Sequence, residues 1–416
     1  MTTAPARERA VIGAVRLPSQ RRSDVEESLQ ELAGLAESAG ATVLERVIQE
    51  RPGATSAYYF GRGKIDAIGT MARELGANLF ISDDALSPIQ ERNISETLGM
   101  KVVDRTALIL DIFAQRARTA EGKLQVELAQ LTYLLPRLVG QWSHLERLGG
   151  GIGTRGPGET QLESDRRVIR HRMNQIRREL GRVGVRRRVR REGRRRRGLP
   201  VVALVGYTNA GKTTLLNRLT GSRFVAANQL FVTLDPAARL VERDGRRPFI
   251  LTDTVGFIRK LPHELVAAFR ATLEELTDAD VLLHVVDASH AAMDEHIAAV
   301  DQLLAELEVA DRPTIMVLNK IDRLDTLPPA LAERHGAVTI SGATGQGIDG
   351  LFDRIADVLR PLAGSVVLRI PHGDGGALAV CYEHGTVLNR RDESDHVEVE
   401  VELPPAIRAS LERYRA

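Results

Sequence analysis

The chain has 416 residues, 43% of them hydrophobic and 27% charged, which is the balance of a globular protein. It is too long for one ordinary core, so we expect several domains. No apolar run of roughly eighteen residues is present, which predicts no membrane span. The single cysteine, Cys381, excludes a disulfide within one chain, and we expect a reducing, cytoplasmic location.

The net charge is only +2, but the basic residues are unevenly distributed. Between Asp165 and Gly198, 16 arginines accompany three acidic residues. This segment predicts a polyanionic partner, with a solvated basic helix and linker as the alternative. Only six of the 57 basic residues are lysine. A chain with this bias keeps lysine by chance or where a compact ammonium group is required.

Residues 1–117 alternate short apolar runs with amphipathic stretches. We predict strands at VIGAV, ATVLERVI, ANLFISDD and KVVD, and helices at Ser23–Ser38, Lys64–Leu75 and Ser87–Leu98. This alternation predicts a small parallel α/β domain. The four residues GRGK, which end at Lys64, are too short to establish a phosphate site.

Residues 118–198 predict an antiparallel helical hairpin with a glycine-rich tip and an arginine-rich linker. An apolar seam with a period of about 3.5 residues runs through Leu124, Leu128, Leu131, Leu135, Leu138, Trp142 and Leu145. A second seam runs through Leu162, Ile169, Met173, Ile176, Leu180 and Val183. Pro136 should kink the first arm, and the spacing of Thr160 and Glu163 predicts that the second arm begins at Thr160. Two separate core helices remain the alternative.

Residues 199–362 again alternate strands and helices, with buried strands expected at VVALVG, RPFILTD, VLLHVVD, PTIMVLN and AVTIS. Residues 363–416 predict a small α+β domain. It contains a half-exposed strand at HVEVEVEL and a closing helix over Pro404–Arg415.

The segment from Gly206 to Thr213 fits the pattern G-x-x-x-x-G-K-[ST], between the apolar run VVALV and the helix-like run LLNRL. Its glycines allow backbone amides to surround phosphates at a helix N-terminus. We expect Lys212 to contact the β- and γ-phosphates, and the Thr213 hydroxyl to bind Mg²⁺.

Two further motifs complete the predicted phosphate and metal site. Asp253 ends a strand and is expected to hold Mg²⁺, while the backbone of Gly256 can approach the γ-phosphate. Thr233 lies between the two metal motifs and is the expected switch threonine. The predicted metal ligands are therefore Thr213, Thr233 and Asp253, and the predicted catalytic residues are Lys212, Thr233 and Gly256.

The base is expected to be guanine, because Asp322 can accept hydrogen bonds from N1–H and the exocyclic amine of guanine, and adenine offers no such pair. The Ser341 loop can supply a backbone N–H to the guanine oxygen. The full set of predicted nucleotide-binding residues is Gly206, Tyr207, Thr208, Asn209, Ala210, Gly211, Lys212, Thr213, Thr214, Phe231, Val232, Thr233, Leu234, Asp235, Asp253, Thr254, Val255, Gly256, Asn319, Lys320, Ile321, Asp322, Ser341, Gly342 and Ala343.

With these motifs in this order, the chain resembles the HflX family of ribosome-associated GTPases. The resemblance rests on GRGK, on GGGIGTRGPGETQLESDRR at residues 149–167, and on FVTLDP and DTVGFIRKLP. It implies a monomeric GTPase that binds the large ribosomal subunit and its rRNA, splits ribosomes, and has a second, ATP-related role in the N-terminal domain. Gly342 departs from the usual alanine, which affects only the rigidity of that loop.

Two features bear on hydrolysis. Phe257 stands where many GTPases place a glutamine that orients water, so we predict slow intrinsic turnover and stimulation by a partner. Asn209 stands where some related GTPases hold K⁺, with an ordinary loop asparagine as the alternative. Two other functions stay open, namely a GTP-gated assembly or RNA-modification factor and a nucleotide-stabilised RNA-binding adaptor.

Overall fold

A computed structural model of the chain describes residues 8–146, 157–196, 199–222, 230–231, 237–243, 246–260, 276–325, 333, 336–363, 365–403 and 405–416. It divides into two compact units. The first comprises Met1–Gly181, Gln229–Phe231 and Arg259–Phe269, and the second comprises Arg182–Asn228, Val232–Ile258 and Arg270–Ala416. The predicted division into four domains stays a prediction. None of the described helices combines the length and apolar character that a bilayer span requires.

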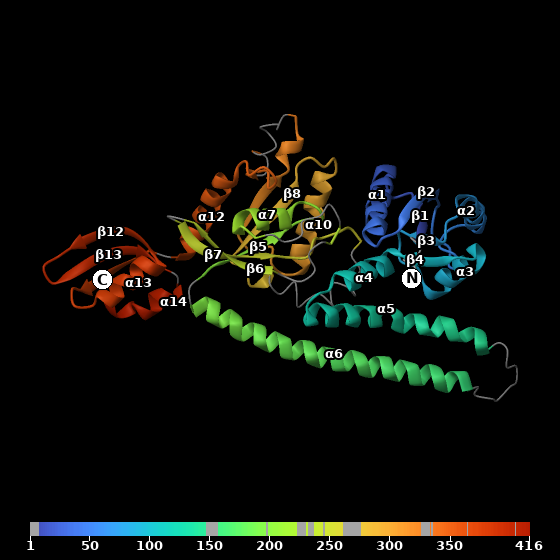
Figure 1. The fold of residues 1–416 in the computed structure, drawn as a ribbon, viewed down its shortest axis with the longest axis horizontal. Coiled ribbons are helices and arrows are strands. Elements are labelled where there is room, and N and C mark those ends of the chain that lie inside the picture. Colours follow the sequence, from blue (N-terminus) through green and yellow to red (C-terminus); the bar gives the residue numbers. More distant parts are fainter. Residues whose placement is uncertain are drawn as a thin grey trace, which may run out of the picture. The chain divides into compact units, whose positions relative to one another are not determined.

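The first unit is built on a four-stranded parallel sheet with the order β2-β1-β3-β4 (Figure 1). Its elements are β1 (Arg9–Arg16), α1 (Arg22–Ser38), β2 (Thr42–Glu50), α2 (Arg62–Leu75), β3 (Leu79–Ser82), α3 (Pro88–Leu98), β4 (Lys101–Asp104) and α4 (Arg105–Arg116). The predicted strands and the three predicted helices are confirmed. Helix α4 was not predicted.

The core of this unit shows why its sequence folds in this way. Alternating strands and helices place α1 against α4 and α2 against α3. The Phe60 and Phe80 rings meet edge to face, with 5.7 Å between their centroids. Gly13 makes room for them, because a Cβ there would lie 2.9 Å from the Phe80 ring. Helix α3 begins with a capping box between Ser87 and Gln90.

Two long helices follow, α5 (Ala120–Glu146) and α6 (Pro157–Arg196). The first part of α6 runs back alongside α5 (Figure 1), and Arg172 donates to both carboxylate oxygens of Glu127, at 2.6 and 2.8 Å. Val126, Met173 and Ile176 are buried. The hairpin is therefore present, while its glycine-rich tip at residues 147–156 lies outside the described residues.

Two details of the hairpin differ from what the sequence predicts. The second arm begins at Pro157 rather than Thr160, because proline suits the first turn, where its missing N–H has no helical partner. The arginine-rich segment expected to be a linker continues the helix to Arg196, since arginine is a good helix former. Pro136 lies within α5.

The middle of α5 is fixed to the parallel sheet through Asp104, the last residue of β4. The Asp104 carboxylate accepts hydrogen bonds from the Tyr133 hydroxyl and from Arg137 Nη2, both at 3.0 Å. It also accepts one from the backbone N–H of Leu86, at 3.1 Å. A buried carboxylate with charged and neutral donors forms a rigid junction.

The second unit contains a six-stranded sheet with the order β10-β9-β8-β5-β7-β6, in which only the edge strand β6 is antiparallel. The elements are β5 (Val201–Val205), α7 (Lys212–Thr220), β6 (Ala237–Arg243), β7 (Arg246–Asp253), β8 (Val281–Asp287), α10 (Met293–Glu306), β9 (Thr314–Asn319), the 3₁₀ turn η1 (Ile321–Arg323), β10 (Val338–Thr339) and α12 (Ile348–Ala363). The five predicted strands are confirmed, and β6 is additional.

The C-terminal part of this unit is a three-stranded antiparallel sheet with the order β11-β13-β12. Its elements are β11 (Ser365–Pro371), α13 (Gly375–His384), β12 (Thr386–Asp392), β13 (His396–Glu402), α14 (Pro405–Ser410) and the 3₁₀ turn η2 (Glu412–Tyr414). The period-two strand HVEVEVEL is confirmed as β13. The predicted closing helix is wrong in length, because the helix ends at Ser410 and a 3₁₀ turn follows.

Candidate nucleotide-binding site

The loop between β5 and α7 turns sharply and requires glycine at both ends. Gly206 has φ 147° and Gly211 has φ 96°. A Cβ on Gly206 would overlap the carbonyl oxygen of Val285, and one on Gly211 would overlap the side-chain amide of Asn319. The loop therefore approaches neighbouring strands closely and delivers its backbone to the N-terminus of α7, where amides favour anions.

Lys212 begins α7 and is almost completely enclosed, with 6% of its surface exposed. Its ammonium group donates to the carbonyl oxygens of Gly206 and Tyr207, at 2.9 and 2.8 Å. Burial lowers the pKa of Lys212 to about 8, an effect that Asp253 opposes and Lys320 reinforces. The lysine thus sits inside the loop as a partly desolvated cation suited to a phosphate.

Thr213 and Asp253 come together from different elements, α7 and the end of β7. The Thr213 hydroxyl donates to Asp253 Oδ2 at 3.0 Å. A hydroxyl and a carboxylate beside a phosphate-binding loop form the hard oxygen donor set that Mg²⁺ prefers. These residues fit the ion that the motifs imply, and Mg²⁺ bound there would neutralise phosphate charge.

Asn319 links the phosphate loop to the loop that follows β10. Its side-chain amide donates to the Ala210 carbonyl at 2.8 Å, and its oxygen accepts from the Gly342 N–H at 2.9 Å. Asn319 is 2% exposed. Arg218 donates to the carbonyls of Gly342 and Ala343 and so supports the same loop.

Lys320 and Asp322 follow Asn319 at the carboxyl end of β9. Lys320 adopts a left-handed conformation, with φ 64°, and its ammonium lies 2.7 Å from Asp287 Oδ2. Burial raises the pKa of Asp287, but hydrogen bonds from Lys320 and Ser289 outweigh burial and hold the pKa below its ordinary value. Asp322 is exposed on η1, where its carboxylate is accessible to a base.

Comparisons with known proteins agree with this geometry. The chain matches family models described as GTP-binding GTPase N-terminal over residues 26–114, GTP-binding GTPase middle region over 116–194, 50S ribosome-binding GTPase over 201–320 and HflX C-terminal domain over 329–415. GTPase HflX of Escherichia coli is 46% identical, over 91% of this chain and 90% of that protein. GTPase HflX of Caldanaerobacter subterraneus is 44% identical, over 98% and 94%.

The chain belongs to the GTPase HflX family. It is therefore a GTP hydrolase. A solved GTP-binding protein from Sulfolobus solfataricus in complex with GDP is 25% identical, with a TM-score of 0.45, covering 85% of this chain and 99% of that one.

The predicted site residues of this HflX-family chain are divided between the two units. The residues between Gly206 and Thr214, those between Asp253 and Gly256, and those from Asn319 to Asp322 and from Ser341 to Ala343 lie in the second unit. Phe231 instead lies in the first unit, where its ring packs against Phe113 at 4.7 Å. Val232, Thr233, Leu234 and Asp235 lie outside the described residues.

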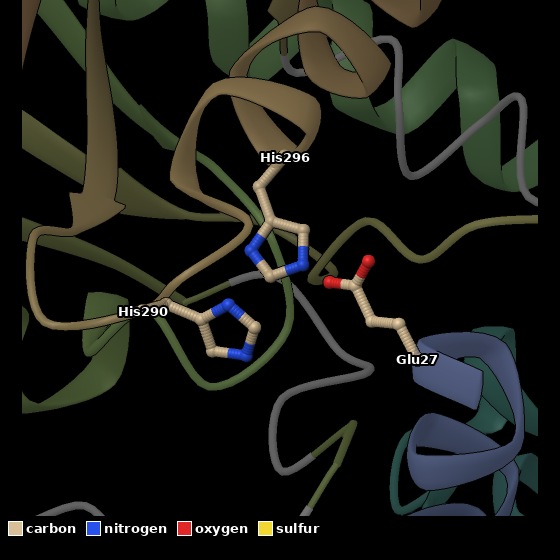
Figure 2. Close-up of side chains that lie close together, drawn as sticks. All are labelled: Glu27, His290 and His296. Carbon is tan, nitrogen blue, oxygen red and sulfur yellow. The ribbon is translucent and has the colours of Figure 1, made fainter. Parts of the chain in front are cut away.

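Sequence reasoning missed an aromatic contact on the phosphate loop. The rings of Tyr207 and His296 stack with 3.8 Å between centroids, and His290 lies 4.5 Å from His296. Figure 2 shows the imidazoles of His290 and His296. The sequence gives no signal for this stack, because His296 follows Tyr207 by almost ninety residues.

Proposed function

We propose that this GTP hydrolase binds the large ribosomal subunit and acts as a nucleotide-gated factor that splits or rescues ribosomes. The match of residues 201–320 to a family described as 50S ribosome-binding GTPases carries the proposal. The rRNA of the subunit is the expected contact for the basic hairpin.

The described part of α6 supports a phosphate-rich partner. Arg172 is paired with Glu127, while the arginines at 167, 170, 177, 178 and 182 are exposed. A projecting helix with spaced guanidinium groups suits the shape and backbone of structured RNA. Subunit binding should therefore weaken strongly as salt concentration rises.

Hydrolysis at this site depends on positioning and charge rather than on a protein base. Lys212 and the backbone of Gly256 would hold the γ-phosphate, while Thr213, Asp253 and Thr233 would hold Mg²⁺. Phe257 is 3% exposed and offers no polar atom to the attacking water. Intrinsic turnover should therefore be slow, and the ribosomal subunit should accelerate it.

Two smaller proposals accompany this function. Asn209 belongs to the phosphate loop and adopts φ 61°, and its side chain would hold K⁺ beside the phosphates. The GRGK segment caps α2 through Gly61 and is the candidate contact for ATP in the N-terminal domain. Equilibrium binding of labelled ATP to the Asp322→Asn variant would test the second proposal, since it removes confusion with the guanine site.

The decisive experiment combines sedimentation with GTP turnover. Whole ribosomes are incubated with the protein and either GDP or a non-hydrolysable GTP analogue, and GTP hydrolysis is measured with and without large subunits. We expect the ribosomal subunits to separate with the analogue but not with GDP. We also expect the large subunit to raise the rate of GTP hydrolysis about 10³-fold or more. Lys212→Ala serves as the inactive control.

Other outcomes would favour the alternatives. Analogue-dependent binding without separation would indicate an assembly or RNA-modification factor. Ribosome binding that is the same with either nucleotide would indicate an adaptor. Equal hydrolysis with and without subunits would refute the proposal that the ribosome supplies the missing assistance.

A further inference from the structure

Lys260 lies three residues beyond Phe257 and is held by two acidic side chains of the first unit. Its ammonium group is 2.6 Å from Asp83 Oδ2 and 2.6 Å from Asp84 Oδ1. Lys260 adopts φ 53°, a left-handed conformation that a lysine rarely takes. Such strain persists only where surrounding contacts compensate for it. The ion pairs therefore determine where this residue lies.

The acidic partner Asp83 belongs to a buried charge network. Its Oδ1 accepts from Arg105 at 2.9 Å, and its Oδ2 also accepts from the Ser28 hydroxyl at 2.7 Å. Burial raises the pKa of Asp83, but the cations Arg105 and Lys260 outweigh burial and keep the pKa below its ordinary value. Asp83 is 1% exposed, so withdrawal of Lys260 would leave a buried carboxylate with one cation instead of two.

The residue before Lys260 is fixed by the same network. Arg259 pairs with Glu27 at 2.8 Å, and its carbonyl oxygen accepts from Arg105 Nη1 at 3.2 Å. Arg105 is itself 2% exposed and also pairs with Glu31, at 2.8 Å. Arg259 and Lys260, the two residues that follow Ile258, are thus held within the first unit by side-chain and backbone contacts.

The residues just before this segment pair with the phosphate loop within the second unit. Thr208 N–H donates to the Phe257 carbonyl at 2.7 Å, and Phe257 N–H donates to the Gly206 carbonyl at 3.1 Å. A Cβ on Gly256 would lie 3.0 Å from Lys212 Nζ, so Gly256 closes over the ammonium group. A γ-phosphate that contacts both Lys212 and Gly256 would enter where Gly256 now closes over the ammonium group.

We propose that Lys260 is a positioning residue for the GTPase reaction: its ion pairs with Asp83 and Asp84 hold the segment after Gly256 in the paired arrangement, and γ-phosphate binding competes with them. The inference rests on the proposed nucleotide site. GDP, which lacks the γ-phosphate, does not oppose the ion pairs. A cavity of about 150 Å³ lined by Asp83, Arg259 and Lys260 gives the lysine space to move.

The test compares affinities for GDP and for a non-hydrolysable GTP analogue in the full-length protein, without ribosomes. Lys260→Met should raise analogue affinity relative to GDP affinity about fivefold, the range of a partly exposed ion pair with a buried partner. Lys260→Arg retains a cation and should stay close to the wild-type ratio. Lys101→Met is the matched control, because it removes the exposed Lys101–Glu8 pair in the same unit.

A double-mutant cycle separates positioning from simple stabilisation. Asp84→Asn should change the affinity ratio in the same direction as Lys260→Met, and the two changes should not add in the double variant. The Asp84→Asn variant also provides a milder test if Lys260→Met folds poorly. An affinity ratio within twofold of wild type in both single variants would overturn the inference, as would equal losses for the two nucleotides.

These results are distinguishable from failure of the proposed function. If subunits do not stimulate hydrolysis but the ratio shifts as expected, the ribosomal proposal fails and the role of Lys260 stands. If the wild-type protein binds neither nucleotide, both fall together.

Discussion

Replacing Asn319 by alanine should disturb the nucleotide site without removing any group expected to touch phosphate. The side chain makes two buried hydrogen bonds, to the Ala210 carbonyl and from the Gly342 N–H. Truncation leaves both backbone groups buried without these partners, at a cost of about 1–3 kcal/mol each. We therefore expect the free energy of unfolding to fall by about 2–6 kcal/mol.

Nucleotide binding should weaken as well, because the phosphate loop and the Ser341 loop lose their common support. If about 2 kcal/mol of the loss is expressed at the site, GDP affinity falls about 30-fold. Fluorescence titration with a labelled GDP measures the affinity, and chemical denaturation measures stability. Asn389→Ala, on an exposed position of β12, is the control. Unchanged affinity and stability in Asn319→Ala would refute the reasoning.

Three further predictions concern the same site. The pKa of about 8 for Lys212 predicts that GTP affinity declines above pH 8, as the free protein loses the cation that phosphate requires. Stability should change in the opposite direction. The pKa of Lys212 is 10.5 in the unfolded chain and about 8 in the folded protein, so between these two pH values the unfolded chain binds more protons. The free energy of unfolding of the apo protein should therefore rise with pH over this range. Titrations of GTP binding and of unfolding across pH 7–10 should show opposite slopes. Asp322→Asn should reduce GTP affinity about 5- to 150-fold and leave weak ATP binding unchanged in a competition assay, because the lost carboxylate pairs only with guanine. Hydrolysis in KCl should exceed that in NaCl at equal ionic strength, and Asn209→Ala should abolish the difference; equal rates in the wild type would exclude the K⁺ proposal.

Much of the fold could be predicted because its strands are short apolar runs bounded by turn residues. Strands such as β5 and β8 are buried on both faces, so their sequences are almost continuously apolar. Edge strand β6, with the sequence AARLVER, lacks this signal because much of it is exposed. Helix α4 escaped prediction because Asp104 ends β4 and caps the helix at once, with no turn between them.

The motifs located the nucleotide site because each has a fixed spacing and a strand before it. The contacts that support the site join residues that lie far apart in the sequence and have no fixed spacing. Asn319 joins two loops, and Lys260 meets acids more than 170 residues earlier in the chain. Such pairings are consequences of tertiary structure and have no local sequence pattern. In the sequence Lys260 is notable only as one of the few lysines in an arginine-rich chain, and its ion pairs with Asp83 and Asp84 become visible only in the structure.

Asp104 and Arg105 are neighbours in the chain, yet they serve different parts of the first unit. Asp104 holds the middle of α5 through Tyr133 and Arg137, and Arg105 holds the carbonyl of Arg259. From Tyr133 to its last residue, Glu146, the helix extends about 20 Å at about 1.5 Å per residue. A tilt of about 5° at Tyr133 would move Glu146 by about 1.7 Å. The junction of β4 and α4 therefore links a small shift beside Arg259 to a displacement at the far end of α5.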